Sequence, residues 1–266
     1  MGKQSGKKQQ QQSHPGKVKS RSANKQNKRS CQQTGGKKNG INCASQSISA
    51  FPAHLMQNGN KNKQLKQTLT ISSLQTLYED GVFYARKFLS SDECKSWIDY
   101  VEGVGFEYMS QKATRDYAHR ECGRFQCTDW KMADALFERM KPLVAQLHSQ
   151  VKLLFPEEHY PLACNGNIRL YKYDRGMSFG KHYDGSNLTI RGETSVTVLI
   201  YLSSCIGGAT RFYPPRKKKT GLAFTPEAGA ILMHLHGDLC LQHEADPVEE
   251  GIKYVLRTDL IFGQTS

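Results

Sequence analysis

The segment FGKHYDGSNL, residues 179–188, places a histidine and an aspartate two positions apart, at His182 and Asp184. In a β-strand, side chains two residues apart point to the same face. An imidazole and a carboxylate would therefore share one side of a sheet. Such a pair is either a polar strand end beside a turn or two ligands of a metal ion. The tripeptide is too short to separate these alternatives, so the rest of the chain must decide.

A third ligand would have to come from a later strand, where three histidines are candidates. His234 and His236 share a face and could form a pair of their own, but the acidic residue that such a pair needs is missing, because Glu244 lies too far along. His243 has the better context, since turn residues and a strand with two cations follow it. Two histidines and one carboxylate on one face leave about three metal positions open, which is typical of non-haem Fe(II) oxygenases.

The two cations are Lys253 and Arg257, ten and fourteen residues after His243. The segment IKYVLRTDLIF alternates, so both cations are expected on one face of a strand. Burying them inside an apolar barrel is costly unless an anion meets them. A bidentate keto acid could take two of the open metal positions, and its far carboxylate would need such a cation.

From about residue 71 to 264, the chain resembles the prolyl-4-hydroxylase-like group of 2-oxoglutarate- and Fe(II)-dependent dioxygenases. The resemblance rests on four blocks in the right order, of which NIRLYKYDRGMSFGKHYDGS and SVTVLIYLSSCIGGATRFYP are the clearest. The matching positions are Tyr173, Gly176, Phe179, His182, Asp184, Gly207, Gly208, Thr210 and Phe212.

This resemblance implies a double-stranded β-helix, or jelly roll, with iron held by His182, Asp184 and His243. It implies that Lys253 pairs with the C5 carboxylate of 2-oxoglutarate, a role that Arg257 could share or take over because its planar fork suits a carboxylate. The other residues that it brings to the co-substrate are Tyr173 and Tyr201, while Arg169 is either part of the same pocket or an exposed strand residue.

The resemblance also implies the reaction. The enzyme would use Fe(II), 2-oxoglutarate and O2, release succinate and CO2, and hydroxylate a substrate, with L-ascorbate keeping the iron reduced. One departure is His234, which stands where the group usually has phenylalanine or another apolar residue. It is either a neighbour of the metal ligands or a core histidine with a satisfied hydrogen bond.

Charge is distributed very unevenly along the 266 residues, whose formal net charge is +13. Residues 1–70 contain fourteen Lys or Arg and no Asp or Glu. This segment is rich in Gln, Ser, Asn and Gly, so we expect it to be a disordered basic tail. It is either a contact for nucleic acid or acidic proteins, or a solubilising tail.

Other features restrict the location of the protein. The sequence shows no secretory signal and no apolar run of 18 residues, so we expect no membrane segment. The eight cysteines form no CxxC pair, which favours reduced thiols. We therefore expect a cytoplasmic or nuclear protein.

Hydrophobic periodicity predicts an α+β domain over residues 71–266, with helices first and strands after them. Helices are expected from Ser90, where Glu93 would complete a capping box, and over residues 130–154. Strands are expected over residues 81–89, 167–173, 195–203 and 252–262, and a hairpin about Gly237–Asp238 joins 228–236 to 239–245.

Three functions remain open from the sequence. The first is a dioxygenase that hydroxylates a protein, possibly at prolyl residues. The second is a nucleic-acid oxygenase or demethylase of the same superfamily, guided by the basic tail. The third is a catalytically silent jelly-roll binding module, against which the intact set of ligands and cations argues.

Overall fold

The computed structural model describes residues 51–56, 71–79, 81–215 and 219–264. Its helices are η1 (Ala53–Met56), α1 (Ser91–Val104), α2 (Trp130–Val151), η2 (Lys152–Leu154) and η4 (Gly237–Leu239). Its strands are β1 (Gln75–Tyr78), β2 (Val82–Ala85), β3 (Glu107–Gln111), β4 (Arg120–Thr128), β5 (His159–Cys164), β6 (Asn167–Tyr173), β7 (Phe179–His182), β8 (Leu188–Thr189), β9 (Gly192–Tyr201), β10 (Ile206–Gly207), β11 (Thr210–Phe212), β12 (Leu222–Phe224), β13 (Ile231–Leu235), β14 (His243–Ala245), β15 (Val248–Glu250) and β16 (Lys253–Gln264). None of the helices in these residues is long and apolar enough to cross a membrane.

The two long helices form where the sequence predicts them. At the start of α1, the Ser90 hydroxyl accepts a hydrogen bond from the Glu93 backbone N–H, and the Glu93 carboxylate accepts one from the Ser90 N–H, which confirms the capping box. At the start of α2, Asp129 caps the backbone N–H of Met132. Pro142 lies inside α2, but the helix continues through it to Val151.

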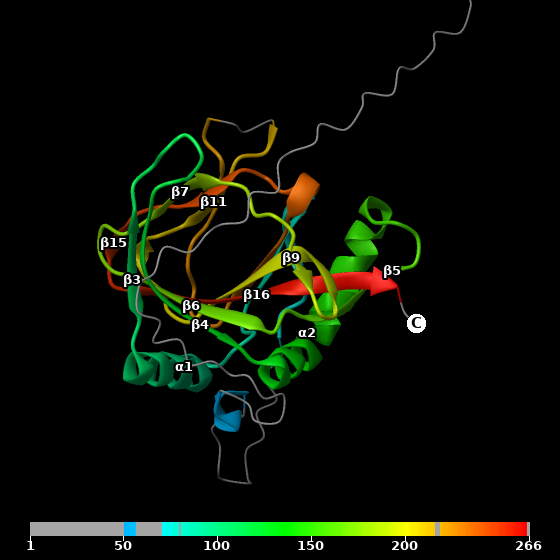
Figure 1. Ribbon diagram of the computed structural model, residues 1–266, viewed down its shortest axis with the longest axis horizontal. Helices are drawn as coiled ribbons and strands as arrows, with labels where there is room; N and C mark the ends of the chain where they lie inside the picture. The colour runs from blue at the N-terminus through cyan, green and yellow to red at the C-terminus, as the bar shows by residue number, and fades with distance from the viewer. Residues whose placement is uncertain (1–50, 57–70, 80, 216–218, 265–266) are drawn as a thin grey trace, which may run out of the picture. The chain divides into compact units, whose positions relative to one another are not determined.

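The strands pair antiparallel throughout the described residues and curl into a nearly closed barrel, which confirms the jelly-roll prediction (Figure 1). Strand β16 is central, because it pairs with β5, β6 and β9. Strand β4 continues the sheet by pairing with both β6 and β7. Strand β7 then leads to β14, β11 and β12.

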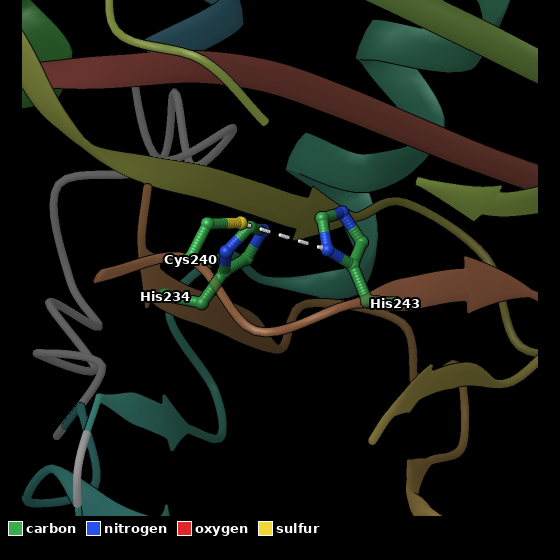
Figure 2. Close-up of side chains that lie close together, drawn as sticks. All are labelled: His234, Cys240 and His243. Carbon is green, nitrogen blue, oxygen red and sulfur yellow. Dashed lines mark hydrogen bonds between the residues drawn. The ribbon is translucent and has the colours of Figure 1, made fainter. Parts of the chain in front are cut away.

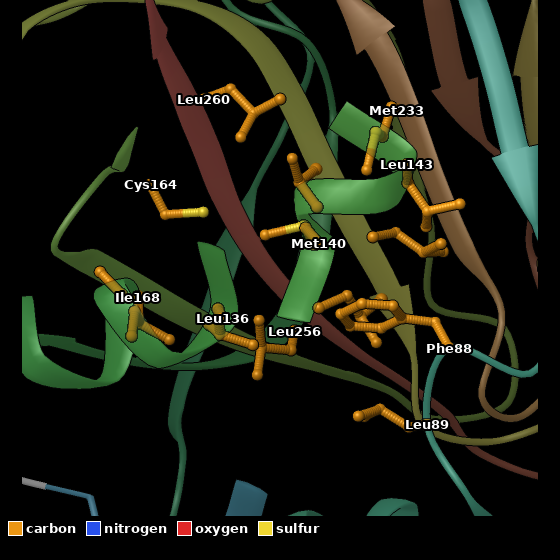
Figure 3. Close-up of a cluster of buried hydrophobic side chains, with 14 of the residues drawn as sticks. Phe88, Leu89, Leu136, Met140, Leu143, Cys164, Ile168, Met233, Leu256 and Leu260 are labelled. Carbon is orange, nitrogen blue, oxygen red and sulfur yellow. The ribbon is translucent and has the colours of Figure 1, made fainter. Parts of the chain in front are cut away.

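The sheet has one apolar face and one face that carries polar groups. On β6, Ile168 and Leu170 belong to the main hydrophobic core together with residues of α1 and α2. Side chains of the helices and of β13 and β16 meet in this core (Figure 3). The alternate residues of β6 and β16, such as Tyr173 and Lys253, point to the other face. This alternation places the candidate site inside the barrel, away from the helices.

Two sequence predictions differ from the structure. The expected hairpin about Gly237–Asp238 does not form, because β13 pairs with β2 and β9 whereas β14 pairs with β7 and β11. The 3-10 turn η4 and the residues after it connect the end of β13 to the start of β14. In addition, Phe51 and Leu55 are buried in the main core, so the domain includes part of the segment predicted as a tail over 1–70. The rest of that segment lies outside the described residues.

Candidate metal and 2-oxoglutarate site

Three side chains that the sequence analysis selected lie together where β7 ends. His182 is the last residue of β7, Asp184 follows it, and His243 opens β14. The two strands pair with His182 directly opposite His243. One ligand atom from each of the three residues lies within 4.8 Å of the other two. The strand pairing therefore creates a group of the kind that binds a metal ion.

Both imidazoles are held in the form that a metal ion needs. Nδ1 of His182 lies 2.8 Å from the carbonyl oxygen of Gly180, and Nδ1 of His243 lies 2.9 Å from that of Leu241. An Nδ1–H that donates to each carbonyl leaves the Nε2 lone pair free. The two Nε2 atoms face the carboxylate of Asp184 at 3.7 and 3.6 Å. Burial lowers the pKa of both rings to about 4, so both are neutral at pH 7.

The Asp184 carboxylate is held ionised. Burial alone would raise its pKa, but the Arg257 guanidinium and the nearby histidines hold it well below its usual range. Nη1 of Arg257 donates to Oδ1 at 3.1 Å, and the Thr197 hydroxyl donates to Oδ2 at 2.9 Å. One anionic oxygen ligand and two neutral imidazoles suit Fe(II), and their facing lone pairs are unfavourable without a cation between them. The donor set therefore fits the metal that the sequence predicts.

A cavity adjoins these ligands, and a buried lysine lines it. The Lys253 side chain donates from Nζ to the carbonyl oxygen of Gly208 at 2.7 Å. Within the described part of the chain, no carboxylate lies within 4 Å of this amine, and burial lowers its pKa to about 8. A buried ammonium without a counter-ion is costly, so a carboxylate that enters the cavity would gain from it.

Arg257 also lines the cavity, but its guanidinium is already occupied. It contacts Asp184 at one end, and its Nε donates to Asp259 Oδ1 at 3.3 Å. Asp259 is fully buried and forms a second ion pair with Arg169. Of the two cations predicted for the co-substrate, Lys253 is therefore the one that can still pair with a carboxylate.

The two predicted tyrosines are placed differently. Tyr173 lines the cavity, beside Lys253. Tyr201 does not line it; its hydroxyl forms a 2.8 Å hydrogen bond with the Thr210 hydroxyl, and Thr210 lines the cavity. Arg169 belongs to the ion pair with Asp259 behind the cavity and is neither of the two alternatives expected for it.

Sequence reasoning missed several neighbours of the site. Thr197 was given no role, although its hydroxyl donates a hydrogen bond to Asp184. Arg120 comes from β4, which the sequence analysis did not predict. Its guanidinium lies 4.8 Å from the ring centroid of Tyr171 and 4.5 Å from that of Phe179, at the cavity wall. No sequence signal connects Arg120 to the other residues, because the contacts depend on the pairing of β4 with β7 and β6.

Comparisons with known proteins give one matching family model and several similar proteins. Residues 168–258 match the family model of the 2OG-Fe(II) oxygenase superfamily. A probable prolyl 4-hydroxylase 6 from Arabidopsis thaliana is 26% identical over 209 residues, covering 68% of this chain and 68% of that protein. Among solved structures, the chain is similar to a viral collagen prolyl hydroxylase of Paramecium Bursaria Chlorella virus-1, with a TM-score of 0.48, 16% identity and coverage of 67% of this chain and 94% of that one. A prolyl hydroxylase from Trichoplax adhaerens gives a TM-score of 0.49, 17% identity and coverage of 68% and 84%.

The matched residues include His182, Asp184, His243 and Lys253. They therefore span the whole cluster of candidate ligands and the buried lysine. Residues 168–258 are therefore similar to the 2OG-Fe(II) oxygenase superfamily, and the chain resembles the prolyl 4-hydroxylase-like proteins within it.

Proposed function

We propose that this oxidoreductase hydroxylates a protein or peptide substrate, at prolyl residues, while it converts 2-oxoglutarate and O2 into succinate and CO2. The match of residues 168–258 to the 2OG-Fe(II) oxygenase superfamily supports the use of Fe(II) and 2-oxoglutarate, and ascorbate is typical of prolyl 4-hydroxylases. The observation that supports the proposal best is the convergence of His182, Asp184 and His243 beside the uncompensated amine of Lys253. The prolyl substrate class rests on the likeness to the plant relative.

Each residue of the candidate site has a separate role in the proposed reaction. His182, Asp184 and His243 would hold Fe(II), which supplies the redox chemistry when bound. Lys253 would bind the far carboxylate of 2-oxoglutarate and so orient it in the cavity. Arg257 keeps Asp184 deprotonated by pairing with it.

The test is turnover by the purified full chain with Fe(II), 2-oxoglutarate and ascorbate. Succinate is measured without substrate and with synthetic proline-containing peptides, and mass spectrometry detects a gain of oxygen by the peptide. We expect Asp184→Ala and His182→Ala to lose succinate formation while retaining their circular dichroism spectrum. Undiminished turnover in either variant would show that the ligands are misassigned, and a folded wild-type protein without any turnover would favour the silent binding module.

A nucleic-acid substrate is the second candidate, because the fourteen basic residues of the N-terminal segment give the chain its positive charge. The same assay with single-stranded RNA and DNA oligonucleotides in place of peptides distinguishes it. Oxygen gained by the oligonucleotide and not by the peptides would favour this candidate.

A further inference from the structure

A third histidine, His234, faces the same carboxylate as the two predicted ligands. It lies on β13, and it is only 1% exposed. Its Nε2 lies 3.5 Å from Oδ2 of Asp184, and the corresponding distance for His243 is 3.6 Å. The ring centroids of His234 and His243 are 4.6 Å apart. By position alone, His234 is as close to the carboxylate as a residue already assigned to the metal.

The orientation of this ring matches that of the two predicted ligands. Nδ1 of His234 lies 3.1 Å from the carbonyl oxygen of Leu235, so Nδ1–H donates there and Nε2 carries a lone pair. This Nε2 is buried, and among the residues that the structure describes it has no hydrogen-bond partner. Leaving such an acceptor unsatisfied is unfavourable, and here it also faces a carboxylate oxygen. Both expectations from the sequence are met in part: His234 is a buried histidine with one satisfied hydrogen bond, at Nδ1, and its Nε2 is a neighbour of the metal ligands.

Cys240 is the other soft donor nearby, and Figure 2 shows it with His234 and His243. Its sulfur already accepts a hydrogen bond from the backbone N–H of Asp184 at 3.2 Å and donates to the carbonyl oxygen of Leu241 at 3.3 Å. Both the donor and the acceptor of the thiol are therefore engaged, whereas Nε2 of His234 makes no hydrogen bond within the described residues. The imidazole is the better candidate for a metal ligand.

We propose that His234 is a fourth protein ligand of the metal ion, through Nε2. The inference rests on the proposed function, because it adds a donor to the site of His182, Asp184 and His243. A six-coordinate ion with four protein ligands keeps two external positions, just enough for a bidentate keto acid. His234 would then have to leave the ion before a further external ligand could bind. Phenylalanine, which is usual at this position in the group, would leave that position open.

The experiment uses the full chain, freed of metal by a chelator, and Co²⁺ alone as the probe. Visible absorption reports the coordination of Co²⁺, competition with a chelator gives its affinity, and X-ray absorption counts the bound imidazoles. We expect three imidazoles in the wild type and two in His234→Phe, with the affinity weakened by about tenfold or more. His234→Gln is the second variant, in case phenylalanine disturbs folding, and it too should retain two imidazoles. His148→Phe removes a histidine of α2 from outside the site and should retain all three.

An imidazole count and a Co²⁺ affinity unchanged in both His234 variants would overturn the proposal. The variant His182→Ala separates this failure from failure of the whole site. If His182→Ala loses Co²⁺ and the His234 variants do not, the site stands and only the fourth ligand is wrong. If His182→Ala also binds Co²⁺ like the wild type, the metal site and the proposed function both fail.

Discussion

Replacing Lys253 with methionine should stabilise the metal-free protein while it removes 2-oxoglutarate binding. Burial lowers the pKa of this amine from 10.5 to about 8, and such a shift corresponds to ~3 kcal/mol of unfavourable free energy for keeping the charge in the folded state. Methionine has a similar length and carries no charge. The loss of the hydrogen bond to Gly208 offsets part of the gain, since an unsatisfied carbonyl costs about 1–3 kcal/mol.

The pH dependence gives this prediction its signature. A lysine whose folded pKa lies below its unfolded pKa destabilises the fold fully below the folded value, here about 8. The penalty disappears as the pH rises toward the unfolded value, 10.5. The stability advantage of Lys253→Met should therefore be present at pH 7 and shrink between pH 8 and 10.

Urea denaturation at a series of pH values measures this difference, and isothermal titration of the Mn²⁺-loaded protein measures 2-oxoglutarate binding. Lys152→Met, which removes an exposed lysine, is the matched control and should change neither quantity. A Lys253→Met protein that is less stable than the wild type at every pH would refute the reasoning about burial. Unchanged 2-oxoglutarate affinity would refute the assignment of the anchor.

Three further predictions concern the charges around the site. Arg257→Met should destabilise the protein by about 3–5 kcal/mol, because it leaves the buried carboxylates of Asp184 and Asp259 without this shared cation. An unchanged free energy of unfolding in thermal or urea denaturation would contradict this. The KM for 2-oxoglutarate should rise by about fivefold between pH 8 and pH 9 as Lys253 loses its proton, and a flat profile in steady-state assays would contradict the role of the charged amine. Deleting residues 1–45 should remove salt-dependent RNA binding without loss of the fold if that segment contacts nucleic acid; in filter-binding assays, equal affinity of both proteins would exclude it.

The sequence predicted the elements whose signals are local. The capping box at Ser90 and Glu93 needs only residues three apart, and it defines the start of α1 as expected. The alternation in residues 167–173 coincides with β6, because one face of that strand packs in the core and the other does not. Residues with the right spacing for metal ligands were also found, since His182 and Asp184 are close in sequence.

Contacts that depend on strand pairing could not be predicted from the sequence. The turn residues Gly237–Asp238 indicated a hairpin, but η4 and the residues after it carry the chain between strands that do not pair with each other. Spacing placed Lys253 and Arg257 on one face and could not show that the arginine is occupied by Asp184. The partner of an arginine depends on the tertiary fold, and here it favours Lys253 as the cation for the co-substrate.

A crystal structure of the protein with Mn²⁺ and 2-oxoglutarate under anaerobic conditions would test the central claim most directly. We predict the ion within about 2.5 Å of Nε2 of His182, Nε2 of His243 and a carboxylate oxygen of Asp184, with the C5 carboxylate of the keto acid against Nζ of Lys253. An ion bound elsewhere, or a His243 ring turned away from it, would contradict the account.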